Sequence, residues 1–364
     1  MADIWCRSCP GRFSLSPTGL LFASFCFLYL GFFRYYHHAS HRDSTSYFFD
    51  PSRAYERRYS STRIAEAEEF LKSADSILRP AQPEDWTPTI CVGIATVARR
   101  GDQYVGLTVA SLLAGLNEFE RKSIFLNLLI GNTEASKHPI YSEKWIETLP
   151  DRVLTYRQED PDFERIKYWE EGGYYRNKTI YDYTRLLRDC HDTGAEYLPS
   201  ALHALGSVKK RAVEGKWIYL RLFYVDELLG WNSEEWPRYL VWSILIWALL
   251  TGIMVAAKKG FKNELKSIPT STTPGVHEMN KYGCCSQGLV FPRAIIPDFL
   301  ERTDLTTDWL VDMMIEKVAD DEGWTRWAVV PPLLQHVGAT SSKGHGFDDS
   351  AKTLWNFRFE DYPY

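Results

Sequence analysis

The sequence predicts a chain of the α/β class, and three patterns support that prediction. A short apolar run, TICVGIATVARR from residue 89, precedes the helical pattern YVGLTVASLLAGL from residue 104. Two further runs, SIFLNLLIG from residue 123 and RVLTYRQ from residue 152, have the length and composition of strands. The segment KTIYDYTRLLRDCHDTG from residue 178 has helical spacing and ends in glycine. Strand, helix, strand, strand and helix in this order open an α/β domain.

The composition is that of a globular protein. With 45% hydrophobic and 24% charged residues, the chain is excluded from the disordered class. The formal charge of −5 gives no general attraction to nucleic acid, so no nucleic-acid partner is expected. Seven cysteines without CxxC spacing indicate neither a disulfide scaffold nor a zinc site. The predicted folded part contains Cys91, Cys190, Cys284 and Cys285.

The first long apolar run, residues 17–36, predicts an uncleaved transmembrane anchor. It is longer than the apolar core of most signal peptides and lacks a small-x-small cleavage site. Residues 1–16 then form a short cytoplasmic tail, and the chain after the anchor faces the secretory lumen. The sequon at Asn177 is compatible with that side. Residues 37–88 are predicted to be a stem, with a leading helix over residues 61–75.

A second apolar run, residues 239–257, carries no charge and predicts an internal transmembrane helix. At about 1.5 Å per residue, a helix of this length nearly spans a hydrocarbon layer of ~30 Å. The residues that follow are too polar to contain a second span. A single crossing places residues 89–238 and residues 258–364 on opposite sides of the membrane, where they cannot pack as one sheet. The alternative is that this run does not span.

Six motifs between residues 91 and 358 resemble a known family when taken together. They are GIATVARR, KTIYDYTRLLRDC, KWIYLRLFYVDELLGW, HEMNKYGCCSQGLVFPR, VDMMIEKVADDEGWTRWAVVP and QHVGATSSKG. The chain resembles the Golgi glycosyltransferases that add an N-acetylgalactosamine side branch to glycosylphosphatidylinositol (GPI) anchors. More remotely, it is similar to N-acetylglucosaminyltransferase IV.

The resemblance implies a fold and a division of the chain. The implied fold is α/β, a GT-A-like (Rossmann-like) glycosyltransferase domain interrupted by a transmembrane segment, with an N-terminal transmembrane anchor. Residues 89–238 are then the donor nucleotide side of that domain, and residues 258–364 are its acceptor side. In the family a hairpin of two transmembrane helices interrupts the domain, so the single run at residues 239–257 indicates the loss of one helix.

The resemblance also implies a reaction. N-acetylgalactosamine is transferred from UDP-GalNAc to a mannose of the GPI-anchor glycan, with Mn²⁺ as cofactor, at the Golgi membrane with the catalytic part lumenal. The implied partners are the UDP-sugar donor, the glycan of a GPI-anchored protein and membrane lipid. Two alternatives stay open: an N-acetylhexosaminyltransferase acting on N-glycans, and a catalytically dead membrane-bound binder of nucleotide sugar or GPI.

The sequence departs from the family at the metal motif. Transferases of this kind hold a divalent cation with paired acidic residues at the end of a strand, because carboxylates and the donor diphosphate together satisfy a hard cation. Here the chain runs from GAEY directly to LPSALHALGSVKK, and Glu196 is the only carboxylate nearby. An internal deletion explains the gap, and it favours the catalytically dead binder.

The end of the first predicted strand is the candidate donor site. By the resemblance, the backbone around Thr96 and Val97 receives the base, and Arg99 or Arg100 meets phosphate. The structural alternative is a strand end with two solvated arginines.

The turn YGCCSQG is the candidate sugar-binding segment, with Cys284, Cys285, Ser286 and Gln287. In an oxidising lumen the adjacent cysteines can form a vicinal disulfide, with Ser286 and Gln287 as hydrogen-bonding groups. Two free buried thiols are the alternative, because a vicinal disulfide is strained.

Asp312 matches the family's acid near the acceptor and is the candidate catalytic base. Transfer requires a carboxylate that takes the proton from the attacking sugar hydroxyl. Asp308 and Glu316 lie about one helical turn to either side and compete for this role. Without the resemblance, an acid on an amphipathic helix is usually part of a solvated face.

His336 is the candidate metal ligand, through an imidazole nitrogen that binds the metal or the leaving diphosphate. Ser341, Ser342 and Lys343 follow it and are candidate phosphate-binding residues. The alternative is a structural histidine placed after an apolar strand.

Overall fold

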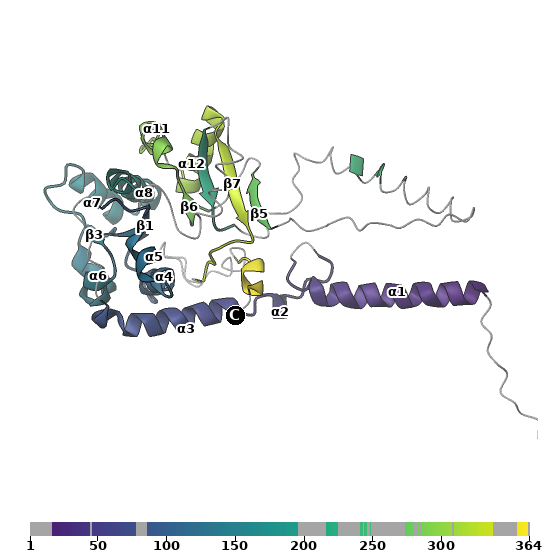
Figure 1. Ribbon diagram of the computed structural model, residues 1–364. Helices are drawn as coiled ribbons and strands as arrows, with labels where there is room; N and C mark the ends of the chain where they lie inside the picture. The colour runs from purple at the N-terminus through teal and green to yellow at the C-terminus, as the bar shows by residue number, and fades with distance from the viewer. Residues whose placement is uncertain are drawn as a thin grey trace, which may run out of the picture. The chain divides into compact units, whose positions relative to one another are not determined.

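The computed structural model divides the chain into two compact units, Met1–Glu56 and Arg57–Tyr364. Figure 1 shows the helices and strands of both units with their labels. The residues that the structure describes are 17–43, 46–77, 86–195, 216–224, 241–242, 244–245, 248, 274–279, 283, 285–307, 309–337 and 355–362.

The first unit contains the helices α1 (Pro17–Ala39) and α2 (Pro51–Ala54). Asp50 caps α2 by accepting a hydrogen bond from the backbone N–H of Ser52 at 3.1 Å, a usual way to satisfy the first free amides of a helix. Helix α1 exposes many large apolar side chains: Phe25, Phe27, Leu28, Tyr29, Leu30, Phe32, Phe33, Tyr35 and Tyr36.

The membrane part of the predicted fold class is wrong. Within the described ranges, no helix is long and apolar enough to cross a membrane. The predicted anchor at residues 17–36 lies in α1, whose last part carries Arg34 and then two tyrosines and two histidines in place of apolar residues. A charge inside a spanning helix is costly, which limits the usable apolar length. Most of the predicted internal helix at residues 239–257 lies outside the described residues.

The first sheet of the second unit is parallel. It contains β1 (Ile90–Thr96), β2 (Ile124–Ile130) and β3 (Arg152–Leu154) in the order β1-β2-β3. Strand β2 is almost wholly buried, in keeping with its continuous apolar sequence. These strands were all predicted from the sequence, and the prediction is confirmed.

Helices pack against this sheet. Helix α4 (Val105–Leu113) joins the core beside β2, and α3 (Tyr59–Lys72), which confirms the predicted leading helix, packs against α4. Helix α8 (Tyr175–Asp192), also predicted, packs against β1 and β2. The connections contain the short helices α5 (Glu118–Lys122), α6 (Trp145–Thr148) and α7 (Phe163–Glu171).

The second sheet is mixed. It contains β4 (Trp217–Arg221), β5 (Gly275–Glu278), β6 (Leu289–Val290) and β7 (Thr325–Val330) in the order β5-β7-β4-β6. Only the β4–β7 pair is parallel. The expectation of one continuous sheet is therefore corrected, because the described strands form two small sheets.

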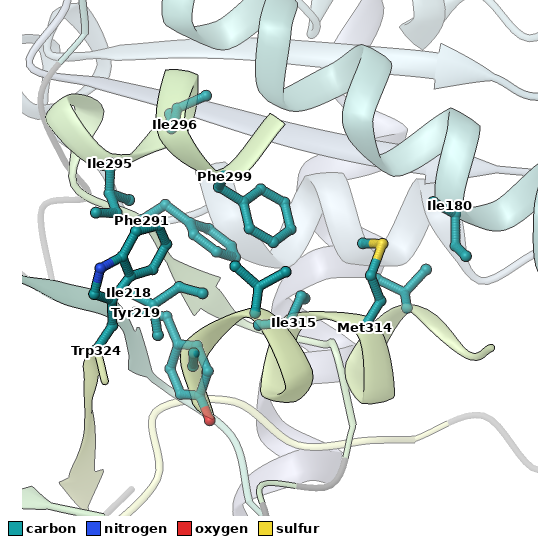
Figure 2. Packing of buried hydrophobic residues seen from close by; sticks show 13 residues of the cluster. Ile180, Ile218, Tyr219, Phe291, Ile295, Ile296, Phe299, Met314, Ile315 and Trp324 are labelled. Atoms are coloured by element: carbon teal, nitrogen blue, oxygen red, sulfur yellow. The ribbon is translucent and has the colours of Figure 1, made fainter. Parts of the chain in front are cut away.

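The second sheet has its own core. Helices α11 (Ile296–Glu301) and α12 (Val311–Glu322) contribute Phe299, Met314 and Ile315, which pack with Phe291 (Figure 2). Ile180 of α8 belongs to the same cluster. Since α8 also packs against β1 and β2, this helix connects the two sheets.

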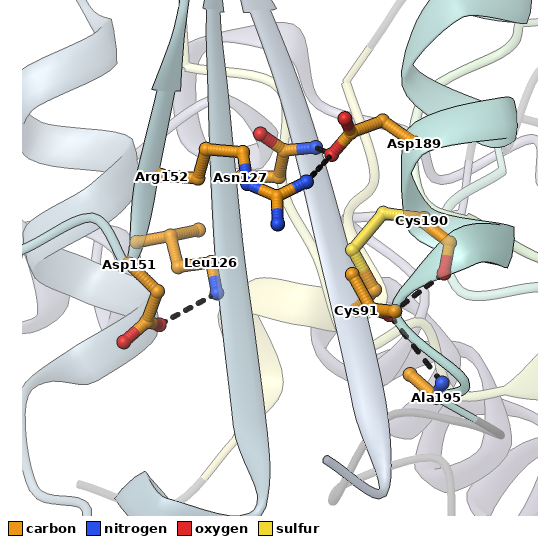
Figure 3. The surroundings of a disulfide bond; sticks show 9 residues. Cys91, Leu126, Asn127, Asp151, Arg152, Asp189, Cys190 and Ala195 are labelled. Atoms are coloured by element: carbon orange, nitrogen blue, oxygen red, sulfur yellow. Dashed lines mark hydrogen bonds and ion pairs between the residues drawn. A yellow bond between two sulfur atoms is a disulfide. The ribbon is translucent and has the colours of Figure 1, made fainter. Parts of the chain in front are cut away.

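A disulfide joins Cys91, near the start of β1, to Cys190, near the end of α8 (Figure 3). Beside it, Asp189 accepts hydrogen bonds from the side chains of Asn127 and Arg152. The bond closes a long loop, with a sequence separation of 99 residues. It fixes α8 against the amino end of the first sheet.

Candidate functional site

The carboxyl ends of β1 and β2 form the first part of the site. Open α/β sheets bind ligands at this edge. The backbone N–H of Gly131, just after β2, donates to the Thr96 carbonyl at 2.7 Å, which ties the two strand ends together. The Thr96 hydroxyl lies 3.0 Å from Nε2 of His138, whose Nδ1 accepts from the Ile140 N–H at 3.3 Å. This arrangement leaves Nε2 as the protonated nitrogen that donates to Thr96.

The loop after β1 holds Arg99 by its backbone. The Gln103 side chain closes the loop, since it accepts from the Arg99 N–H at 3.3 Å and donates to the Arg99 and Gly101 carbonyls, both at 2.8 Å. Gly101 has φ of 142°, a conformation that favours glycine. Val97 is half-buried behind this loop, while Arg100 is exposed. The loop therefore presents Arg99 from a fixed backbone.

A buried ion pair, missed by the sequence analysis, lies beneath this edge. Lys178 Nζ donates to the Gly131 carbonyl and lies 3.0 Å from Asp182 Oδ2. Tyr156 donates its hydroxyl proton to the same carboxylate. Burial raises the pKa of Asp182, and the charge of Lys178 opposes that rise. A Lys–Asp pair four residues apart in a predicted helix was the available signal.

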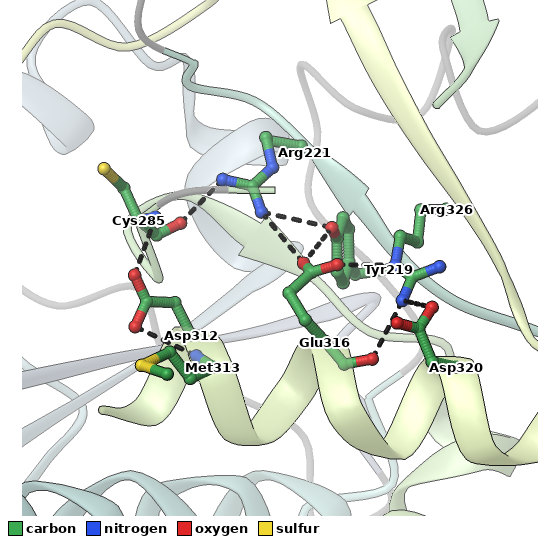
Figure 4. Close-up of polar contacts among 8 residues, drawn as sticks. All are labelled: Tyr219, Arg221, Cys285, Asp312, Met313, Glu316, Asp320 and Arg326. Atoms are coloured by element: carbon green, nitrogen blue, oxygen red, sulfur yellow. Dashed lines mark hydrogen bonds and ion pairs between the residues drawn. The ribbon is translucent and has the colours of Figure 1, made fainter. Parts of the chain in front are cut away.

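Asp312, in the first turn of α12, is held by two backbone amides (Figure 4). Its Oδ2 accepts from the Cys285 N–H and its Oδ1 from the Met313 N–H, each at 3.0 Å. Cys285 is buried, has φ of 75° and is disulfide-bonded. The free-thiol alternative is therefore wrong for Cys285. The position of Cys284 lies outside the described residues.

The rest of the candidate sugar-binding segment forms a turn before β6. Ser286 is half-buried and Gln287 is exposed in this turn. The turn and Asp312 are adjacent, since the Cys285 N–H donates to Asp312 Oδ2.

Asp308 and Glu316 are the two acids that compete with Asp312 for the role of base. Glu316 is occupied by structural contacts, because it accepts from the Tyr219 hydroxyl and lies 3.4 Å from Arg221 Nη2 and 2.6 Å from Arg326 Nε. Asp308 lies outside the described residues. Asp312, in contrast, accepts a hydrogen bond from a backbone N–H of the turn.

His336 lies in the segment that follows β7, with its ring centroid 6.5 Å from that of Phe223. The segment after β7 is anchored where the Leu333 N–H donates to the Leu222 carbonyl at 2.8 Å. In the described part of the chain, His336 Nδ1 is buried and has no hydrogen-bond partner. Burial lowers the pKa of His336, and the nearby positive charge of Arg99 lowers it further.

The remaining candidate phosphate ligands, Ser341, Ser342 and Lys343, lie outside the described residues.

The described residues do not fit a Mn²⁺ ion. They contain no group of three or more His, Cys, Asp or Glu side chains placed to hold a metal. The charged neighbour that acts on His336 is an arginine, which repels a cation. A guanidinium such as that of Arg99 suits an anion such as a phosphate, which it binds through N–H donors.

Comparison with known proteins gives no relative: no protein-family model, no curated protein and no solved structure matches the chain.

Proposed function

We propose that this protein is a glycosyltransferase that transfers N-acetylgalactosamine from UDP-GalNAc to a mannose of a GPI-anchor glycan. The observation that supports it best is the loop after β1, where the Gln103 side chain holds the backbone of Arg99 at the carboxyl edge of a parallel sheet. Open α/β sheets bind nucleotides at this edge, and a guanidinium placed there suits a phosphate group. The choice of sugar and acceptor rests on the resemblance of the six motifs.

In the proposed reaction the acceptor hydroxyl oxygen forms a bond to the anomeric carbon of the donor sugar. The bond from that carbon to the diphosphate breaks, and UDP leaves with the electron pair. Asp312 takes the proton of the attacking hydroxyl, and Arg99 neutralises charge on the departing diphosphate. No step is assigned to Mn²⁺, because the described residues do not supply a suitable ligand set.

The oxidised cysteines support a location in an oxidising compartment. The bond between Cys91 and Cys190 and the oxidised state of Cys285 are typical of a protein that folds in an oxidising environment. The Golgi lumen is such an environment, and GPI-anchored acceptors pass through it.

A nucleotide-sugar binder without activity is the second candidate. The poor fit to a metal favours it, since this reaction commonly uses a cation on the diphosphate.

The test is UDP binding and sugar transfer by the purified chain. Calorimetry with UDP, with and without Mn²⁺, is combined with mass spectrometry of a GPI-glycan acceptor incubated with UDP-GalNAc. Arg99→Gln is expected to weaken UDP binding by about 10- to 100-fold, the range of one charge-assisted contact. The matched control is Arg152→Gln, at the opposite edge of the first sheet, which should leave binding unchanged.

The outcomes separate the candidates. Binding with addition of one N-acetylhexosamine supports the transferase. UDP binding without transfer supports the binder, and absence of UDP binding contradicts both.

A further inference from the structure

Arg221 is a charged side chain in the interior of the second sheet. It is the last residue of β4 and is only 1% exposed. Taking a guanidinium out of water is costly, and a buried ion pair often stabilises a protein no more than apolar residues of the same volume. A role in the site therefore explains this residue better than a contribution to stability.

The contacts of Arg221 lead to Asp312 through one residue. Nη1 of Arg221 donates to the Cys285 carbonyl at 2.7 Å, and Nη2 donates to the Tyr219 hydroxyl at 3.1 Å. The N–H of the same Cys285 donates to Asp312 Oδ2 at 3.0 Å. Arg221 thus holds the peptide group on one side of the Cys285 Cα, and Asp312 accepts from the group on the other side (Figure 4).

Gly283 shows how tightly the turn is pressed against this network. A Cβ at Gly283 would lie 2.6 Å from the Tyr219 hydroxyl oxygen and 2.7 Å from Glu316 Oε1, and it would overlap Arg221 Nη2. No side chain fits there unless the network or the turn moves. The backbone of the turn therefore rests directly on the buried charges.

We propose that Arg221 is a positioning residue that orients the Asp312 carboxylate through the turn at Gly283 and Cys285. This inference rests on the proposed function. Arg221 fixes the Cys285 peptide groups, and the Cys285 and Met313 amides then fix both oxygens of Asp312. The remaining lone pairs of the carboxylate point in set directions toward an acceptor hydroxyl.

The matched control for Arg221 is Arg326. Its side chain is also buried, at 5% exposed, and it pairs with the same Glu316, at 2.6 Å, and with Asp320. Among the described residues, the Arg326 side chain contacts Glu316 and Asp320 and not the turn. Arg326→Met therefore removes a comparable buried charge while Cys285 and Asp312 keep their hydrogen bonds.

The experiment is a double-mutant cycle on transfer kinetics. Arg221→Met is expected to lower kcat by about 10- to 100-fold with the KM for UDP-GalNAc within about twofold of wild type, since a misplaced base slows chemistry and not donor binding. In the Asp312→Asn background the same change should lower kcat by less than about threefold, because the group that Arg221 positions is already disabled. Arg326→Met should leave kcat within about twofold.

A second variant distinguishes the loss of positioning from a folding defect. Gly283→Ala disturbs the contact between the turn and Arg221 while the Arg221 and Asp312 side chains are both retained, and it should reproduce the loss of kcat. Thermal unfolding and UDP affinity check that each variant is folded.

Additive losses from Arg221→Met and Asp312→Asn would overturn the positioning role, and so would an equal loss from Arg326→Met. Wild-type protein that binds UDP but does not transfer sugar overturns the transferase proposal, and the positioning role with it.

Discussion

The buried ion pairs at the two sheets differ in how far apart their partners lie in the sequence. At the first sheet, Lys178 and Asp182 lie four residues apart on the single helix α8. At the second sheet, Arg221 meets Glu316 from a separation of 95 residues. The first pair is set by local helix geometry, whereas the second forms only when β4 and α12 have packed. The Lys178–Asp182 pair therefore depends on the geometry of one helix, and the Arg221–Glu316 pair depends on the packing of two elements that are far apart in the sequence.

We expect the largest effect when the ion pair between Lys178 and Asp182 is removed. Lys178→Met leaves the Asp182 carboxylate buried without its cation, and the free energy of unfolding should fall by roughly 3–5 kcal/mol. Urea unfolding followed by circular dichroism measures this. The control is Arg152→Met, which removes an ion pair to Asp189 from a half-exposed arginine and should cost about 0–1 kcal/mol. Equal losses in the two variants would refute the distinction.

We expect the second largest effect when the disulfide between Cys91 and Cys190 is removed. Replacing both Cys91 and Cys190 with serine should lower the free energy of unfolding by roughly 2–4 kcal/mol, because the reduced chain regains the entropy of a long open loop. Cys26→Ser is the control, since Cys26 is a free thiol in the first unit. If the double variant unfolds at the same urea concentration as wild type, the link between β1 and α8 is not stabilising.

Glu360 offers a smaller test, at the start of α3. Its carboxylate accepts from the Arg58 N–H at 2.8 Å and the Ser60 N–H at 3.2 Å, at the start of α3, and Gln335 donates to it at 3.1 Å. Glu360→Gln should cost about 1–2 kcal/mol, since it removes a charged acceptor from a helix start. The control Glu69→Gln changes an exposed acid of the same helix and should have no measurable effect. A loss of the same size in both variants would contradict this role.

The smallest expected effect depends on pH. Burial lowers the pKa of His138, and the charge of Arg99 lowers it further. Below about pH 6.5, His138 binds a proton in the unfolded chain, whereas in the folded protein it binds one only at a lower pH. The free energy of unfolding should therefore fall as the pH drops below that value. In His138→Gln the fall between pH 7 and pH 5 should be shallower. Parallel curves for the two proteins would show that His138 does not contribute.

The parts of the fold that the sequence predicted are those with a local signature. Strand β2 is a continuous apolar run, and α8 has helical spacing with a glycine stop, so both could be recognised before any contact was known. The same reasoning failed for residues 17–36. An apolar run resembles a membrane span by composition, but whether it can span depends on where charged and polar residues interrupt its helix.

The site was predicted in part. The sequence analysis placed Thr96 and Arg99 at a strand end and Asp312 on a helix, and the structure puts these residues in those places. It did not predict that Asp312 lies beside the cysteine turn. It missed the disulfide of Cys91, the ion pair of Lys178 and the buried Arg221. Two of these contacts join residues more than 90 positions apart, and no local pattern records such a pairing.

The most direct test of the account is a double-mutant cycle on UDP affinity with Arg99→Gln and His336→Gln. If both groups bind one diphosphate, their contributions to UDP affinity should be coupled. The fold loss of affinity in the double variant should then be smaller than the product of the two single fold losses. Calorimetry at fixed ionic strength gives all the dissociation constants. Strictly additive losses, or no loss from either variant, would contradict a shared anion site between the two sheets.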